Sequence, residues 1–298
     1  MDSNQRKKII LCIVLCVYLV VFGFFTIFIN QRVSEKKKLI PKETKEPTTE
    51  ILDARPLWEQ IDTYLKDKNI PEEMIGISVS CFDQEDTFYD YNGNQEFIAA
   101  STYKVPLAML WYDKIAQGRA QLSDTLPYGS NCYEMGGPIG DTYAPGSYIS
   151  LQELLDAMIV YSDNTAGHIL FESLGGWEQF KEDAAKYSTL QLNHQFFSNE
   201  NYLSPNYCRD VMKYLYEHKE TYLDLIQNMK KSKKGDYLDA KINVSMPQKY
   251  GEYDSFENAI GFVEAKHAYS ICIFTELGSM GIDVMSEINA MCYAFFNQ

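Results

Sequence analysis

The stretch FIAASTYKVPLAMLWY, residues 97–112, sets a serine and a lysine into an otherwise apolar run. The face that carries Ser101 and Lys104 continues at helical spacing with Val105, Ala108, Met109, Tyr112 and Ile115. Both polar residues are therefore expected at a buried helix start, where an unpaired ammonium is costly. We expect Lys104 to have hydrogen-bond partners, a lowered pKa, or both.

The chain before this stretch divides by composition. Residues 9–29 contain 21 residues without a charge, which is long enough to cross a bilayer as a helix. Because no small-residue cleavage site follows, an uncleaved signal-anchor in the cell membrane is expected, with residues 1–8 as a short cytoplasmic N-terminus. Residues 30–50 are polar and predict a disordered stalk, and residues 51–298 predict one folded domain. Basic residues flank the span on both sides, so the distribution of positive charge does not decide its orientation. We expect the domain outside the cytoplasm because of the chemistry that its motifs indicate.

Charge separates the two parts of the chain. Residues 1–48 carry a net charge of +5, and the remainder carries −19. So acidic a domain is a poor partner for nucleic acid or for anionic lipid. If the domain binds an anionic ligand, local cations must overcome the global field.

Cysteine and histidine usage predicts neither disulfides nor a metal site. Two of the seven cysteines lie within residues 9–29, and the other five form no CxxC pair, so buried free thiols are favoured over a disulfide framework. The four histidines show no metal-ligand spacing. They are His168, His194, His218 and His267. No metal or cofactor is expected.

Periodicity over residues 51–298 predicts an α+β fold. Helices are expected at residues 55–67, 101–118, 150–160, 205–217, 220–230 and 282–296. Strands are expected at residues 75–82, 87–91, 249–254, 257–265 and 269–276. A long polar loop should connect the second and third helices. Strands at both ends with helices between them indicate one antiparallel sheet built from both ends of the domain, flanked by helices, with an all-helical insertion.

Two further short motifs follow the first along the chain. Ser162, Asp163 and Asn164 come directly after a predicted helix, and Lys249, Tyr250 and Gly251 open a predicted strand pair. Taken alone, the Ser-Asp-Asn tripeptide is equally well explained as a helix-capping turn. The presence of the other two motifs, and the order of all three along the chain, favour a functional role for the tripeptide.

These three motifs, in this order, resemble the S-x-x-K, S-D-N and K-T-G set of class A β-lactamases and penicillin-binding DD-peptidases. The resemblance covers roughly residues 55–298 and implies a serine hydrolase with a monomeric catalytic domain. Ser101 would be the nucleophile and Lys104 the neighbouring base that activates it. Ser162 would bridge the lysines and pass a proton to the leaving nitrogen.

The resemblance also implies how a substrate is held. Asn164 would bind a side-chain amide, and Lys249 would hold the carboxylate of a β-lactam or of a peptidoglycan stem ending in D-Ala-D-Ala. Gly251 would let the substrate lie close along the strand. The backbone amides of Ser101 and Glu252 would form the oxyanion hole. Asp163 is expected to orient the loop.

Two positions depart from the family pattern. Tyr250 stands where the family has a small hydroxyl residue, which puts carboxylate binding in doubt. Glu200 imitates the class A glutamate that activates the deacylating water, but a helix expected at Pro205 leaves its loop about ten residues short. We expect Glu200 to be an ordinary exposed residue, with a role as deacylation base as the alternative.

Three functions stay open at this point. The first is a membrane-anchored extracytoplasmic serine hydrolase, which is acylated at Ser101 and deacylated by water. The second is a β-lactam or cell-wall sensor that keeps its acyl group. The third is a non-catalytic peptidoglycan-binding module.

Overall fold

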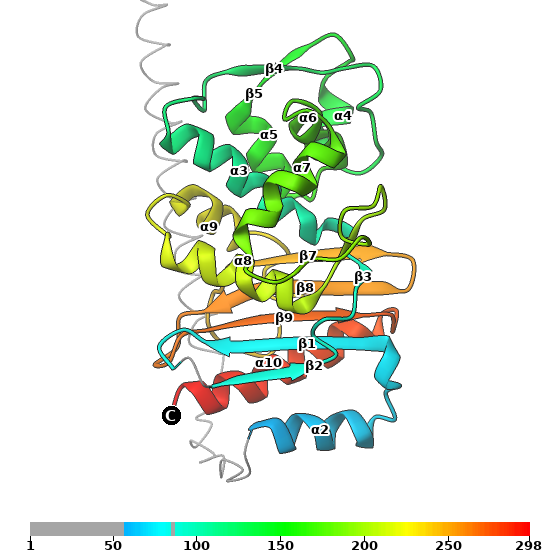
Figure 1. Ribbon diagram of the computed structural model, residues 1–298, viewed down its shortest axis with the longest axis vertical. Coiled ribbons are helices and arrows are strands. Elements are labelled where there is room, and N and C mark those ends of the chain that lie inside the picture. Colours follow the sequence, from blue (N-terminus) through cyan, green and yellow to red (C-terminus); the bar gives the residue numbers. More distant parts are fainter. Residues whose placement is uncertain (1–56, 85–86) are drawn as a thin grey trace, which may run out of the picture. The chain divides into compact units, whose positions relative to one another are not determined.

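The computed structural model describes residues 57–84 and 87–298 (Figure 1). The predicted cytoplasmic N-terminus, transmembrane segment and stalk lie outside the described residues. Within those two ranges, no helix combines the length and the apolar character that crossing a membrane requires.

A five-stranded antiparallel sheet carries strands from both ends of the domain, as predicted. Its order is β2-β1-β9-β8-β7, so the C-terminal strands β7 to β9 continue the sheet from the N-terminal hairpin (Figure 1). The strands are β1 (Ile75–Cys81), β2 (Phe88–Tyr91), β7 (Gln248–Tyr253), β8 (Phe256–Val263) and β9 (Tyr269–Thr275). β7 forms one edge of the sheet, where its residues are free to meet the helical part of the domain.

The central strand β9 is buried along its whole length because both of its faces are covered. Ile271 and Ile273 point into a core with helices α2 (Leu57–Asp67) and α10 (Met280–Phe296). The alternate residues Cys272 and Phe274 belong to a second core, which includes helix α8 (Pro205–Glu217). The sheet is thus sandwiched between helices, as the two-sided burial of its strands requires.

The insertion between β2 and β7 is mainly helical, but the predicted all-helical insertion was wrong in that it also contains two short strand pairs. It contains α3 (Lys104–Ala116), α4 (Pro138–Thr142), α5 (Leu151–Val160), α6 (Asn164–Glu172), α7 (Trp177–Ala184), α8 and α9 (Leu223–Met229). The Ser150 hydroxyl caps α5 by accepting a hydrogen bond from the Glu153 amide at 3.3 Å, as the sequence predicted.

The prediction of a long polar loop before α5 was wrong in part. It contains α4 and a two-stranded pair, β4 (Thr125–Pro127) with β5 (Tyr148–Ser150). Strands of three residues give no periodic signal, so tertiary pairing alone defines them.

A second short pair connects the Ser101 region to the loop that holds Glu200. β3 (Phe97–Ile98) pairs with β6 (Tyr202–Leu203). The segment just before Ser101 is thus held against the segment just after Glu200. Pairing of two residues each brings together segments about a hundred positions apart in sequence.

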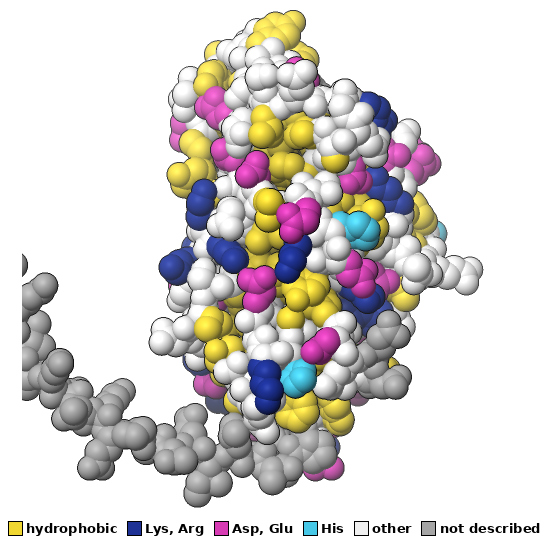
Figure 2. Space-filling model, turned by 90° about the vertical axis from the view of Figure 1, so that its left-hand side faces the viewer, with side chains coloured by type: hydrophobic (Ala, Val, Ile, Leu, Met, Phe, Trp, Pro, Cys, Tyr) yellow, Lys and Arg dark blue, Asp and Glu magenta, His cyan; other side chains and the backbone are white. Residues whose placement is uncertain are grey.

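The five described cysteines are buried free thiols, as predicted. They are Cys81, Cys132, Cys208, Cys272 and Cys292. On the face shown in Figure 2, basic side chains are scattered among acidic ones and form no continuous patch.

Candidate active site

Ser101 lies in a tight turn immediately before a buried helix. The turn is a 3-10 segment, η2 (Ala100–Tyr103), and Lys104 is the first residue of α3. Ala100 has a left-handed backbone (φ 48°), which costs a residue with a Cβ about 1 kcal/mol or more. The turn therefore needs support from its neighbours.

Asn201, which the sequence analysis did not single out, supplies that support. Its side-chain amide donates to the Ala100 carbonyl at 2.7 Å. The Ala99 amide donates in return to the Asn201 carbonyl at 2.8 Å. The strained turn and the loop are thus fixed to each other, and a lone asparagine in a polar loop carries no sequence signal of that contact.

The Lys104 ammonium is buried and surrounded by oxygen atoms. Its Nζ lies 3.0 Å from Ser101 Oγ and 3.3 Å from Ser162 Oγ. It also donates to the Ser162 carbonyl and to Asn164 Oδ1, both at 2.6 Å. The structure thus gives Lys104 the hydrogen-bond partners that its burial predicts.

Burial also shifts the proton affinity of this lysine. Desolvation lowers the pKa of Lys104 from its usual value near 10.5 to about 7, although the carboxylates of Asp163 and Glu134 oppose the shift. A neutral amine beside Ser101 is therefore accessible near neutral pH. Such an amine can accept the proton of the serine hydroxyl.

Ser162 joins the two lysines of the site. Its hydroxyl lies 3.3 Å from Lys104 Nζ and 3.0 Å from Lys249 Nζ. Ser162 also has a left-handed backbone (φ 58°), which aims both its carbonyl and its hydroxyl at Lys104. Three polar groups from the α5–α6 connection, α3 and β7 thus meet in one chain of contacts beside Ser101.

Asp163 holds this turn in place, as expected of it. One carboxylate oxygen accepts from the Ala166 amide at 2.7 Å and caps α6. The other accepts from the Ile139 amide at 2.7 Å and so ties α6 to α4. Asp163 is fully buried and orients Ser162 without facing the cavity.

Asn164 contributes both ends of its side-chain amide to the site. Its oxygen accepts from Lys104 at 2.6 Å, and its nitrogen donates to the Met135 carbonyl at 2.9 Å. Asn164 lines the cavities described below, so one N–H still faces the space where a substrate amide is predicted to bind.

A glycine is needed at position 251 because β7 packs closely against the turn that carries Ser101. A Cβ at this position would come within 2.7 Å of the Ala99 carbonyl and 2.8 Å of the Ser101 amide nitrogen. Strand β7 therefore lies directly against the Ser101 turn. The next residue, Glu252, shares both cavities with Ser101, which is where the predicted oxyanion-hole amides must point.

Two cavities meet at Ser101. One, of about 600 Å³, has Tyr103, His168, Phe171 and Trp177 in its lining. The other, of about 380 Å³, is lined by Ser162 and Tyr250 together with the segment after Gly251. Four residues line both cavities, namely Ser101, Asn164, Glu252 and Tyr253, so Ser101 stands between an aromatic wall and the end of β7.

Glu200 lines the larger cavity, but its side chain is exposed. Helix α8 begins at Pro205, as predicted, so the loop that holds Glu200 is short. The base of the loop is rigid, because the buried Lys181 donates to the Tyr202 carbonyl at 2.8 Å and lies 4.2 Å from the Phe196 ring centroid. Burial lowers the pKa of Lys181 to about 7. Lys181 is a second residue that the sequence analysis missed.

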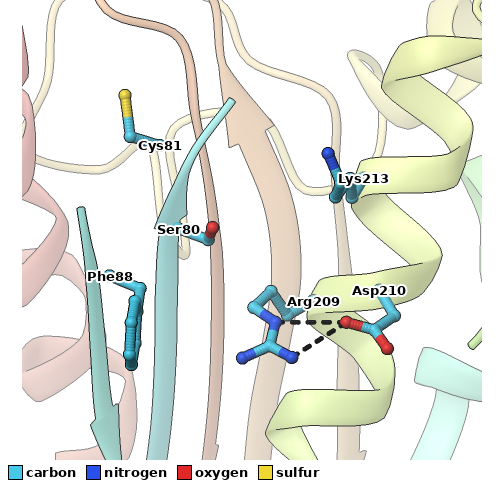
Figure 3. Close-up of a pocket in the computed structure, with 6 residues that line it drawn as sticks. All are labelled: Ser80, Cys81, Phe88, Arg209, Asp210 and Lys213. Carbon is cyan, nitrogen blue, oxygen red and sulfur yellow. Dashed lines mark hydrogen bonds and ion pairs between the residues drawn. The ribbon is translucent and has the colours of Figure 1, made fainter. Parts of the chain in front are cut away.

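A separate cavity of about 290 Å³ lies between β1, β2 and α8 (Figure 3). Arg209 points into it but is already paired with Asp210 at 2.9 Å and donates to Asn206 at 3.2 Å. This cavity shares no lining residue with the two at Ser101. Its third charged side chain, Lys213, is paired with Glu217 outside the lining.

Among the described residues, no three His, Cys, Asp or Glu side chains gather as a metal site would require. His168 instead pairs with Glu134 at 2.7 Å at the edge of the larger cavity. The other three histidines line neither of the two cavities at Ser101.

A model of the β-lactamase enzyme family matches residues 56–296. The chain belongs to this family. Shorter segments match curated β-lactamases: 36% identity over 92 residues with a β-lactamase of Bacillus subtilis (strain 168), and 34% over 102 residues with β-lactamase PSE-4 of Pseudomonas aeruginosa. These segments cover 31% and 34% of this chain, and they span only 29% and 35% of the length of those proteins.

Solved structures agree over the whole folded domain of this β-lactamase family member. An acyl-enzyme complex of a PBP-A mutant with penicillin G superposes with a TM-score of 0.70 and 20% identity, covering 80% of this chain and 96% of that one. The TLA-3 extended-spectrum β-lactamase gives 0.70 and 18%, covering 81% and 98%. At such identities the likeness establishes the α+β serine β-lactamase fold.

Proposed function

We propose that this protein is a serine acyl hydrolase that forms an acyl-enzyme at Ser101 with β-lactams or with D-Ala-D-Ala-type cell-wall peptides. The observation that carries the proposal is the chain of contacts from Ser101 Oγ through Lys104 and Ser162 to Lys249, at 3.0, 3.3 and 3.0 Å. The PBP-A neighbour, which holds penicillin G as an acyl-enzyme, supports the same substrate class.

Acylation follows from the positions of these groups. Ser101 Oγ attacks the carbonyl carbon while its proton moves to the neutral amine of Lys104. The negative charge on the carbonyl oxygen faces the backbone amides of Ser101 and Glu252, a stabilisation worth about 3 to 4 kcal/mol per donor in studied enzymes. The C–N bond then breaks, and the nitrogen takes the Ser162 hydroxyl proton. Lys104 returns its proton to Ser162 and becomes neutral again.

Deacylation requires water to attack the new ester, releasing the acid and restoring the serine hydroxyl. Glu200 is exposed at the edge of the cavity, and the short loop gives it little reach. A slowly released acyl group is therefore the second candidate behaviour, and it is the property that a β-lactam or cell-wall sensor needs. The paired, buried lysines argue against a purely non-catalytic peptidoglycan-binding module.

The test is covalent labelling with a fluorescent penicillin followed by a denaturing gel. We expect label on the wild-type chain and none on Ser101→Ala, which removes one oxygen from a turn held by Asn201. Equal labelling of both proteins would exclude Ser101 as the nucleophile. Absence of label on both, at saturating probe and long incubation, would favour the non-catalytic module.

The same proposal includes the location of the domain. The charge-free residues 9–29 would anchor the chain in the cell membrane, and the domain would face the cell wall, where its substrate class occurs. Protease added to intact cells should then release a fragment that begins within residues 30–50. Protection until the cells are lysed would place the domain in the cytoplasm, away from that substrate.

A further inference from the structure

The Lys249 ammonium has no free donor for a substrate carboxylate. A lysine ammonium carries three N–H groups. Lys249 Nζ contacts Ser162 Oγ at 3.0 Å, donates to the Tyr250 carbonyl at 2.9 Å and faces the Tyr250 ring, whose centroid is 3.9 Å away. These three contacts use the whole capacity of a side chain that is also 0% exposed.

The Tyr250 ring that covers Lys249 is itself held in place. It packs on the Tyr237 ring at a centroid distance of 5.0 Å, and the Lys233 ammonium lies 5.5 Å from its centroid. Tyr237 in turn donates to Glu257 at 3.0 Å, so the stack is anchored on β8. Tyr250 is therefore a fixed cover and would have to leave this stack to expose Lys249.

The cavity on this side of Ser101 is acidic. Tyr250, Glu252 and Asp254 line it, and neither Lys nor Arg occurs among the described residues that line this cavity or the larger one. Glu252 and Asp254 are exposed in this lining, so their charge repels an approaching anion, whereas the exposed Lys233 lies against the Tyr250 ring and does not line the cavity. Burial and the nearby Lys104 also lower the pKa of Lys249.

We propose that Tyr250 disfavours a carboxylate on the leaving-group side of the site, so that among β-lactams and cell-wall peptides the enzyme reacts faster with those whose leaving group is neutral or positively charged. This inference rests on the proposed acylation of Ser101 and narrows its substrate class. A small hydroxyl residue at this position would leave one face of Lys249 open to a carboxylate. Tyr250 fills that face with its ring, while Glu252 and Asp254 favour a neutral or cationic group.

The test compares two β-lactams that differ in this group alone, benzylpenicillin and its methyl ester. The second-order rate constant for acylation of Ser101 is measured by intact-protein mass spectrometry on the full chain. We expect the ester-to-acid ratio of rate constants to fall at least about tenfold from wild type to Tyr250→Thr. A factor of ten corresponds to about 1.4 kcal/mol, in the range of one charge-assisted hydrogen bond. The intrinsic reactivity of the two compounds cancels in this comparison.

Two further variants separate the effect of the Tyr250 ring from the effect of negative charge in the cavity lining. Tyr250→Phe keeps the cover over Lys249 and should keep the wild-type ratio. Asp254→Asn removes one charge at a left-handed residue (φ 54°) that asparagine tolerates, so its fold is expected to persist even if Tyr250→Thr is unstable. It should raise the rate constant for the acid about two- to threefold at low salt, and leave that for the ester unchanged.

The outcomes distinguish the two proposals. The proposed effect of Tyr250 on carboxylate would be overturned if the ester-to-acid ratio in Tyr250→Thr equalled that of the wild type. It would also be overturned if benzylpenicillin acylated the Asp254→Asn protein no faster than the wild type at low salt. Failure of both compounds to acylate Ser101 in any of the proteins would instead refute the proposed function, and the substrate class with it.

Discussion

The two sides of Ser101 are built very differently. On the lysine side, Lys104 and Lys249 are 0% exposed and every contact between them and Ser162 is within 3.3 Å. On the loop side, Glu200 is exposed and lies just before β6. The lysines proposed to receive the Ser101 proton are thus fixed by burial, whereas the Glu200 carboxylate, which could activate water, is exposed. The difference favours fast acylation and slow deacylation.

The largest effect is expected from removing the base on the lysine side. Lys104→Ala should lower the acylation rate constant by about 10² to 10⁴, the range for loss of a positioned general base. Lys104→Arg is the matched control, because a guanidinium stays protonated and should be equally slow. Stopped-flow or quenched acylation with a β-lactam measures both. A variant that acylates at the wild-type rate would reduce Lys104 to a structural ammonium.

The pH dependence of acylation sharpens the same point. Because the pKa of Lys104 is lowered to about 7, the fraction of neutral amine grows tenfold per pH unit below 7 and saturates above it. The logarithm of the acylation rate constant should therefore rise with a slope near 1 up to about pH 7 and then level off. A profile that is flat from pH 5 to 9 would contradict a lysine base.

A smaller effect is expected where the two sides are joined. Asn201→Ala removes the 2.7 Å hydrogen bond to the Ala100 carbonyl and frees a strained turn. Acylation should slow by about tenfold, and the free energy of unfolding should fall by about 1 to 2 kcal/mol. Denaturant unfolding separates the two quantities. A stability loss with unchanged acylation would show that the contact does not position Ser101.

The sequence predicted the sheet and most helices because β7 to β9, α8 and α10 are long, with strong periodicity. It also predicted the Ser101, Ser162 and Lys249 motifs, which the fold brings into contact. It could not predict the left-handed Ala100 and Ser162, since neither is a glycine. The roles of Asn201 and Lys181 depend on contacts with other segments of the chain. The Tyr250 ring follows Lys249 directly in sequence, but its place over the ammonium depends on packing against Tyr237.

The smallest effect is expected on the loop side. Glu200→Gln should change the lifetime of the acyl-enzyme by less than about threefold, a margin below about 1 kcal/mol on the barrier. Loss of label after removal of free β-lactam measures the lifetime. If the variant instead accumulates an acyl-enzyme that the wild type clears many times a second, the short loop delivers a functional base, and the contrast between the two sides disappears.

The most direct measurement is a time course of the intact full-length chain with a neutral β-lactam ester, in which mass spectrometry follows the protein and absorbance follows the lactam. The structure predicts one adduct, located on Ser101, that forms faster than it is lost and persists after the free lactam is removed. An unmodified protein with intact lactam would contradict acylation at Ser101. Rapid lactam consumption without an accumulated adduct would contradict the slow deacylation inferred from the exposed Glu200.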